Sequence, residues 1–338
     1  MNRLNFAMKI ALIPAFSLIV ALLSVTGACQ PGESDYNAKL RAPLTAFKAK
    51  YARELNAIPR LKVIAGETKN NDASVLEASG RNALALGNLD EAEVAFATSL
   101  SLQENGLSRL AYAMVLIEEK KYLEAIPSCA EVALVDRYQQ TLNSNDRGVE
   151  LRSAPHILLA YALAQIGEVK TAAIIYNYAI DRRMSEINLE IERNSRDLRQ
   201  FALDRKMMLN LPEILKVFDP EKATAPQLVQ ALRLLWCVGG GDRLGVSMIK
   251  DAYASSPESA LVAYLKGITT FAKSNETYKE RLARNKAGLP FFHRAASLSD
   301  SKSELGMLIV KTQTNFVKNI KEMEDYIQEN RPAFDNMP

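Results

Sequence analysis

The sequence predicts an all-α protein, built from a linear array of helical hairpins and ending in a capping helix. Short apolar runs alternate with stretches rich in Glu, Lys and Arg along most of the 338 residues, a pattern typical of amphipathic helices. Charged residues make up 24% of the chain and aromatic residues only 7%, which fits a folded protein and excludes a disordered or multi-span membrane protein. One pattern of small and large residues over these runs has a second copy 33 residues further on and more degenerate copies downstream, which indicates an internal repeat.

The first 28 residues are expected to lie outside the fold. Arg3 and Lys9 give this segment a basic start, and an almost continuous apolar run follows from Ile10 to Leu23. Small residues then lead to Ala28, so residues 1–28 have the three parts of a secretory signal peptide. The apolar run is shorter than the roughly 20 residues that a spanning helix needs, and an uncleaved membrane anchor is the alternative.

The signal segment ends in a motif that concerns Cys29. Val25-Thr26-Gly27-Ala28-Cys29 resembles the lipobox of bacterial lipoproteins, although Thr26 stands where leucine is more usual. The resemblance implies that Cys29 becomes an acylated N-terminus, which anchors the exported chain to the membrane through its lipid. Gln30, rather than Asp, implies sorting to the outer membrane with the body facing the periplasm. Ordinary cleavage after Ala28, with an unmodified Cys29, is the alternative.

Residues 29–72 should form a tether and an N-terminal helix. Pro31 to Ser34 are polar or helix-breaking and predict the tether, while residues 35–55 have the pattern of an amphipathic helix that acts as a cap or spacer.

Three hairpins are predicted over residues 73–181. Gly87-Asn88-Leu89-Asp90-Glu91-Ala92-Glu93-Val94-Ala95-Phe96 resembles the turn and second helix of a tetratricopeptide repeat, and Gly80 stands at the small site of its first helix. A second copy has Ala113 at the small site, and a third has Ala160 followed by a Gly167 turn. The resemblance implies a solenoid in which small residues let paired helices approach closely while large neighbours fill the space between pairs.

Two degenerate copies are predicted over residues 225–300. The fourth has Arg233 at the small site and a turn over residues 239–241, and Arg233 implies helices that cross further apart. The fifth has Gly267 on its first helix, then an insertion of about a dozen residues, then a second helix that includes Gly288 and Phe292.

The remaining segments are interpreted as accessories. Residues 182–224 should hold a long charged helix, predicted over 181–210, and a linker bracketed by Asp219-Pro220 and Ala225-Pro226. Residues 301–338 should hold a capping helix over 303–330 and a tail, because the apolar residues of that helix recur at intervals of three, four or seven.

Catalytic and metal chemistry finds little support in the sequence. His156 and His293 fall in distant copies, no His, Cys and Asp spacing indicates a metal site, and no cofactor motif is present. Gly239-Gly240-Gly241 lacks the ending of a phosphate loop, and Glu118-Glu119 is interpreted as a solvated face. Cys129 and Cys237 make no disulfide framework, and Cys129 is expected to be a buried inert thiol. We therefore expect a protein that is not an enzyme and has no metal or cofactor.

The charge balance excludes a general attraction to nucleic acid or anionic lipid. The 42 Lys and Arg residues include Arg3 and Lys9, so the mature chain would carry 40 basic against 39 acidic residues.

The concave face of such an array predicts a binding site for a partner protein. In tetratricopeptide arrays the first helix of each pair lines this face, and the resemblance assigns to it Glu77, Arg81, Leu84, Leu110, Met114, Ile117, Ile157, Tyr161, Ala164, Gln230, Leu234, Cys237, Tyr264, Ile268 and Phe271. From the second copy on, the set is mostly apolar. An exposed apolar stripe of that length marks an interface, and Glu77 and Arg81 are spaced to pair with each other.

The leading interpretation is a lipid-anchored envelope scaffold that binds a peptide or helix of a partner protein. Such lipoproteins resemble pilotins, outer-membrane assembly factors and adaptors for cell-wall hydrolases. A structural protein whose groove is filled by its own terminal helices is the first alternative, and an enzyme acting on envelope polymers is the second. A register error of one residue, which would place the apolar set in the core, also remains open.

Overall fold

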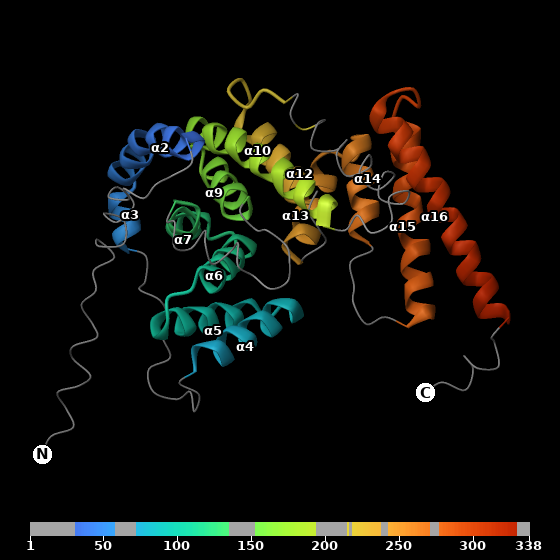
Figure 1. Cartoon of the computed structure of the whole chain (residues 1–338), viewed down its shortest axis with the longest axis horizontal. Helices are drawn as coiled ribbons and strands as arrows, with labels where there is room; N and C mark the ends of the chain where they lie inside the picture. The colour runs from blue at the N-terminus through green and yellow to red at the C-terminus, as the bar shows by residue number, and fades with distance from the viewer. Residues whose placement is uncertain are drawn as a thin grey trace, which may run out of the picture. The chain divides into compact units, whose positions relative to one another are not determined.

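The computed structural model describes residues 31–57, 72–134, 153–193, 215, 218–237, 243–270 and 277–329. Within these ranges the chain is entirely helical, with thirteen helices and no strand, so the prediction of an all-α fold is confirmed (Figure 1). The helices divide into two compact units, unit 1 over Met1–Arg182 and unit 2 over Arg183–Pro338. No helix of the described part is both long and apolar enough to cross a membrane, and the predicted signal segment and Cys29 lie outside the described residues.

Unit 1 holds three helical hairpins that stack in chain order. The helices are α4 (Ala73–Leu86) with α5 (Leu89–Leu102), α6 (Gly106–Glu118) with α7 (Tyr122–Leu134), and α9 (Ala154–Gln165) with α10 (Val169–Arg193). Helix α5 packs on α6, and α7 packs on α9, so each second helix contacts the first helix of the next pair.

The three hairpins share one turn, which shows the repeat in the backbone itself. Gly87, Lys120 and Gly167 all have positive φ, at 86°, 63° and 86°. In each turn the following N–H reaches back to a carbonyl of the first helix: Asn88 to Ala83, Lys121 to Leu116, and Glu168 to Leu163. Glycine suits this left-handed position, and the second hairpin tolerates a lysine there.

Small residues lie where the helices of a pair approach, as the repeat pattern predicts. A Cβ added to Gly80 would meet the ring of Phe96 at 3.0 Å, and Phe96 is fully buried. Ala113 and Ala160, at the small sites of the next two copies, are also fully buried. The close approach of α4 and α5 therefore depends on a glycine facing a phenylalanine.

Two boundaries in unit 1 differ from the sequence prediction. The charged helix predicted over 181–210 does not begin there, because α10 runs without a break from Val169 to Arg193. The rest of that segment, residues 194–210, lies outside the described residues. The predicted tether over Pro31 to Ser34 is helical instead, because proline fits the first turn of a helix, where its missing N–H has no partner to lose.

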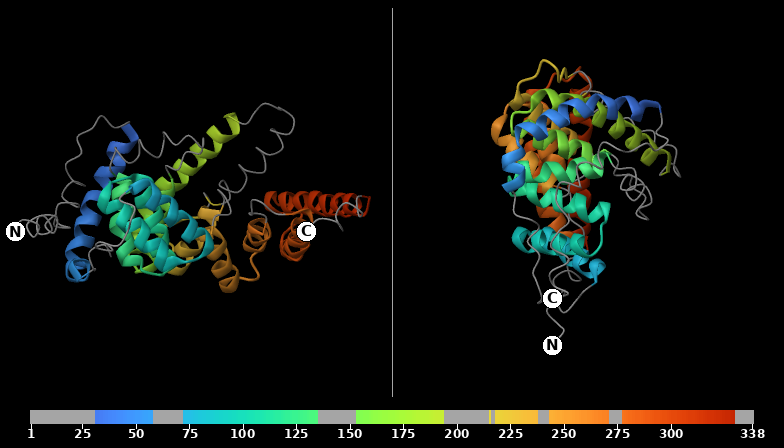
Figure 2. Two further views of the ribbon diagram at one scale, coloured as in Figure 1. Left: turned by 90° about the horizontal axis from the view of Figure 1, so that it is seen from below. Right: turned by 90° about the vertical axis from the view of Figure 1, so that its left-hand side faces the viewer.

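The N-terminal helix α2 (Pro31–Lys50) lies beside the third hairpin of unit 1 and is followed by α3 (Ala52–Ala57) (Figures 1 and 2). Its buried stripe consists of Tyr36, Leu40 and Phe47. Tyr36 contacts His156 near the start of α9, and Tyr51, just after α2, contacts Glu168 at the start of α10. The helix therefore closes the end of the array that lies furthest from it in sequence.

Unit 2 holds two hairpins and a long final helix. The hairpins are α12 (Ala225–Cys237) with α13 (Arg243–Ser255), and α14 (Ala260–Thr269) with α15 (Tyr278–Leu298). The final helix, α16 (Glu304–Glu329), packs against α15 and agrees within one residue with the predicted helix over 303–330. The predicted linker before α12 is non-helical from 218 to 224.

The second hairpin of unit 2 repeats the glycine-to-phenylalanine contact of unit 1. A Cβ on Gly267 would lie 2.8 Å from the ring of Phe292, which is fully buried. Phe316 of α16 packs against the same ring, with centroids 4.9 Å apart and planes tilted by 57°. Arg233 of the first hairpin is half-buried, and its guanidinium is 3.8 Å from Asp251 of α13.

Candidate protein-binding face of the first two hairpins

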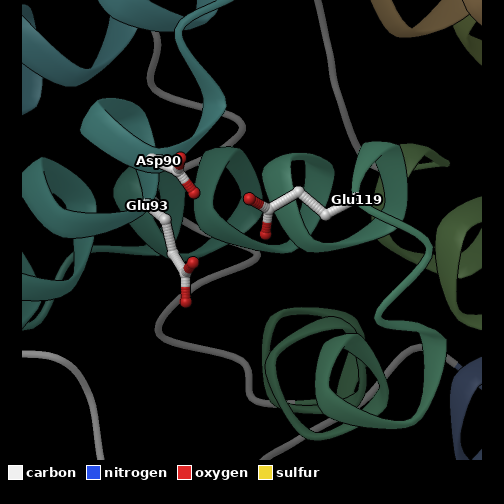
Figure 3. A group of neighbouring side chains, drawn as sticks. All are labelled: Asp90, Glu93 and Glu119. Atoms are coloured by element: carbon white, nitrogen blue, oxygen red, sulfur yellow. The ribbon is translucent and has the colours of Figure 1, made fainter.

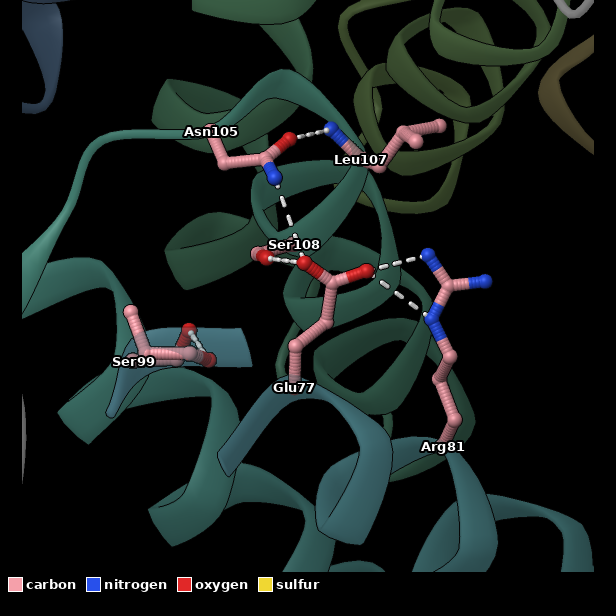
Figure 4. A network of polar contacts seen from close by, with 7 residues as sticks. Glu77, Arg81, Ser99, Asn105, Leu107 and Ser108 are labelled. Atoms are coloured by element: carbon pink, nitrogen blue, oxygen red, sulfur yellow. Dashed lines mark hydrogen bonds and ion pairs between the residues drawn. The ribbon is translucent and has the colours of Figure 1, made fainter. Parts of the chain in front are cut away.

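A network of polar contacts surrounds Glu77 of α4, a first helix of a hairpin (Figure 4). One carboxylate oxygen accepts hydrogen bonds from both Nε and Nη2 of Arg81, the Nε bond at 3.0 Å. The other oxygen accepts from Ser108 Oγ at 2.7 Å and from Asn105 Nδ2 at 3.2 Å. The predicted pairing of Glu77 with Arg81 is thus confirmed, and the same carboxylate also joins α4 to α6.

Local sequence explains why Glu77 reaches this position. Asn105 is the N-cap of α6, and its side-chain oxygen accepts from the backbone N–H of Leu107 at 2.8 Å. That leaves the amide nitrogen of Asn105 free to donate to Glu77. A carboxylate at a helix N-terminus is also favoured by the helix dipole. The first turn of α6 therefore holds the side chain of the preceding hairpin, which fixes the stacking of the two pairs.

Partly exposed side chains continue this face along α4 and α6. Glu77, Arg81 and Leu84 lie at successive turns of α4 and are half-buried, as is Met114 of α6. Arg81 keeps 41% of its side chain exposed beside the 16% exposure of Glu77, so the cation is the more accessible partner. Of the predicted groove, this part presents charged and apolar groups together at the surface.

The exposed apolar stripe predicted for the second and third hairpins is wrong. Leu110 and Ile117 of α6 are buried at 5% and 3% exposure, and Ile157 and Tyr161 of α9 at 1% and 3%. Every residue of α9 from Ala154 to Ala164 is buried. A helix that is apolar on all sides is a core helix rather than the wall of an open groove.

The predicted groove of unit 2 is also largely closed. Leu234, Cys237 and Tyr264 are buried, while Gln230 and Ile268 are half-buried, and Phe271 lies outside the described residues. The Tyr264 hydroxyl lies 3.4 Å from Thr312 Oγ1, so α16 covers this position. The terminal helix thus fills part of the face that the array would otherwise expose.

An aromatic cluster that the sequence analysis missed fastens α2 to the third hairpin. The ring of Tyr36 stacks on Tyr178 of α10, with centroids 3.6 Å apart and planes at 8°. Its hydroxyl is 3.0 Å from Nδ1 of His156, and burial lowers the pKa of His156 to about 3. The guanidinium of Arg182 lies 5.0 Å from the centroid of Tyr178, and its Nε donates to the Tyr178 hydroxyl at 2.7 Å. The apolar stripe of α2 predicts a packed helix, but nothing in its pattern indicates which helix it packs on.

Three carboxylates gather between the first two hairpins (Figure 3). Ligand atoms of Asp90, Glu93 and Glu119 lie within 4.8 Å of one another. Lys121 Nζ lies 2.8 Å from Glu93 and 2.7 Å from Glu119. Burial alone would lower the pKa of Lys121, but its bonds to Glu119 and Glu93 outweigh that and raise it. The ammonium therefore supplies the positive charge of this cluster, and Glu119 is not on the solvated face that was predicted.

The described histidines and cysteines are divided between the two units. His156 is buried in unit 1, whereas His293 is exposed on α15 of unit 2, where its Nδ1 lies 2.8 Å from Gln313 Nε2. Cys129 and Cys237 are both buried, lie in different units and form no disulfide. Burial raises the pKa of the Cys129 thiol, which agrees with the prediction of a buried inert thiol.

Comparison of the chain with protein-family models, with curated proteins and with solved structures gave no significant match.

Proposed function

We propose that the chain is a bacterial lipoprotein, anchored through Cys29, whose hairpins form a tetratricopeptide-like solenoid that binds a partner protein. The proposed location is the cell envelope, with the body in the periplasm and the lipid in the outer membrane. The proposed role is non-catalytic: a scaffold or adaptor in envelope assembly, secretion or pilus biogenesis. The turn shared by the three hairpins of unit 1 supports the solenoid, and the Thr-Gly-Ala-Cys ending of the signal segment supports the anchor.

One observation carries the binding role. Arg81, Leu84 and Met114 lie partly exposed on the first helices of two consecutive hairpins, next to the fixed carboxylate of Glu77. A surface with apolar residues beside a charged group suits a peptide or helix better than it suits a small apolar ligand, because a peptide can contact several shallow sites along an extended surface. We therefore place the partner on α4 and α6 rather than along the whole array.

Site-specific photocrosslinking in the native envelope tests this placement. A photoreactive amino acid at Leu84 or at Met114 should trap a partner that the same residue at Leu102, an exposed leucine on α5, does not trap. Replacing Leu84 or Met114 by alanine should weaken capture by about thirty-fold if each is an anchor worth ~2 kcal/mol. Equal trapping at all three positions would argue against a specific face.

The anchor is tested separately by intact mass. The protein extracted from membranes should have the mass of residues 29–338 plus several acyl chains, and Cys29→Ser should release it into the soluble envelope fraction. A mass that matches the bare polypeptide would contradict the proposed acylation of Cys29.

A second candidate function is a purely structural role with a self-filled groove. The burial of Ile157, Tyr161 and Tyr264 favours it, because α16 and the core of unit 1 already cover these positions. The photocrosslinking experiment separates the two candidates: a structural protein should give no specific adduct at Leu84 or Met114.

A further inference from the structure

The start of α2 is held rigidly on unit 1, although it follows the anchoring cysteine almost directly. Pro31 begins α2 two residues after Cys29. Tyr36, five residues into the helix, is 94% buried between α9 and α10 by its stack on Tyr178 and its bond to His156. A lipoprotein body on a flexible tether would show no such contact.

Contacts at both ends of α2 fix its direction as well as its position. At its C-terminal end, Lys50 Nζ lies 2.6 Å from a carboxylate oxygen of Glu168, and the hydroxyl of Tyr51 donates to the same oxygen at 3.1 Å. Leu40 and Phe47 are buried between these two points. The helix therefore runs along the third hairpin from the His156 end to the Glu168 end and cannot swing away without breaking both sets of contacts.

We propose that the end of unit 1 around Tyr36, His156 and Tyr178 faces the membrane surface and lies against it. The inference rests on Cys29 being the lipid attachment point. The chain from Cys29 to Tyr36 spans seven residues, which reach at most about 25 Å when fully extended and less where they are helical. The third hairpin thus sits next to the lipid, and the first hairpin is the part of unit 1 that reaches away from it.

This end of unit 1 carries groups that can contact lipid headgroups, and electrostatic attraction is not needed to hold it at the membrane. Lys39 and Arg41 are exposed on α2, and the half-buried Arg182 donates from Nε to the Tyr178 hydroxyl at 2.7 Å, so this end offers cations to the phosphates of lipid headgroups. Asp181 is exposed nearby and offsets part of this charge. The short connection to the lipid, rather than electrostatic attraction, keeps this end at the surface.

Energy transfer on vesicles tests the orientation. The chain is prepared without residues 1–28 and coupled through Cys29 to a maleimide lipid, a reaction that spares the buried Cys129 and Cys237. A donor dye is attached through an azido amino acid, either at Asn177, exposed beside Tyr178, or at Asn88, exposed in the turn of the first hairpin. With an acceptor dye on the lipid headgroups, transfer should be several-fold stronger from position 177 than from position 88.

Two variants show whether the docked helix causes the difference. Inserting 20 Gly and Ser residues between Cys29 and Pro31 leaves α2 docked but adds about 25 Å of root-mean-square reach, so transfer from position 177 should fall to about half. Tyr36→Ala should free α2 and make the two positions nearly equal. Should Tyr36→Ala unfold unit 1, the insertion alone still decides the result.

Equal transfer from the two positions, or no response to the insertion, would overturn the proposed orientation. Stronger transfer from position 88 would overturn it as well. Because the lipid is attached chemically, this result does not depend on acylation in the cell, and the mass measurement described above tests the anchor on its own.

Discussion

The two units are each closed by a single helix, but the two closures differ in sequence distance and in chemistry. In unit 1, α2 comes from the N-terminal side and packs on a hairpin more than a hundred residues away, through ring stacking, a tyrosine–histidine hydrogen bond and an ion pair. In unit 2, α16 follows its hairpin directly and buries Leu308, Ile309, Phe316 and Ile320. The stability of a helix held by polar contacts depends on specific partners and on pH, whereas that of a helix held by apolar contacts depends mainly on buried area.

Despite this difference the two units share one packing feature, a buried phenylalanine ring that faces a glycine. Removing that ring should have the largest effect on stability. Phe292→Ala and Phe96→Ala each remove a fully buried ring that faces a glycine, and each should lower the free energy of unfolding of its unit by about 3–5 kcal/mol. Amide hydrogen exchange read by mass spectrometry should show which unit has lost protection. A loss confined to the mutated unit is expected, and loss in both would show that the units do not unfold independently.

The closures themselves should differ by a smaller amount. Phe316→Ala removes the ring of α16 that packs on Phe292 and should cost about 3 kcal/mol. Tyr36→Phe keeps the stack on Tyr178 and removes only the hydroxyl that bonds His156, so it should cost about 1 kcal/mol. Urea unfolding of both variants checks this order. If the two costs are equal, the hydroxyl contributes more to holding α2 than one ordinary hydrogen bond does.

The hairpins could be predicted from sequence because each depends on neighbours within about 20 residues. A close helix pair is predicted by the types and spacing of Gly80 and Phe96 and by the glycine at the Gly87 turn. The docking of α2 could not be predicted, because Tyr36 carries no signal that names His156 as its partner. The groove prediction was wrong for a different reason: α9 is apolar on all sides, which indicates a core helix, but the repeat register assigned one of its faces to a groove.

Acid should weaken the closure of unit 1 more than that of unit 2. The pKa of His156 is about 3 in the folded protein because burial disfavours its charged form, against an ordinary value of 6.5. Between these two values the unfolded chain binds a proton that the folded chain does not, so the free energy of unfolding falls as the pH falls. The slope from this residue is at most about 1.4 kcal/mol per pH unit, and its contribution is constant above pH 6.5.

The variant His156→Phe isolates this effect from the titration of carboxylates, which both proteins share. Unfolding of the parent and the variant is compared from pH 7 to pH 4, and only the parent should lose the additional stability. Protection of α16 from amide exchange should not distinguish the two proteins, since the substituted residue lies in unit 1 and α16 belongs to unit 2. Identical pH profiles for parent and variant would show that the folded protein accommodates the charged imidazole.

The smallest expected effect concerns how each unit uses the equivalent polar position of its first helix. Glu77 bonds forward to Asn105 and Ser108 of the next hairpin, whereas Gln230 bonds within its own hairpin, to the carbonyl of Ala252 at 3.3 Å. Glu77→Ala should cost about 1–2 kcal/mol because it leaves donors on two hairpins without their acceptor. Gln230→Ala should lower the free energy of unfolding by at most about 1 kcal/mol. Arg81→Ala should lower it by about 0.5 kcal/mol, because the Arg81 side chain is 41% exposed and water already screens its ion pair with Glu77. Amide exchange at the start of α6 is the deciding measurement, because only Glu77→Ala should speed it. If exchange there does not change, the carboxylate merely satisfies local donors and the stacking of the first two hairpins rests on apolar contacts alone.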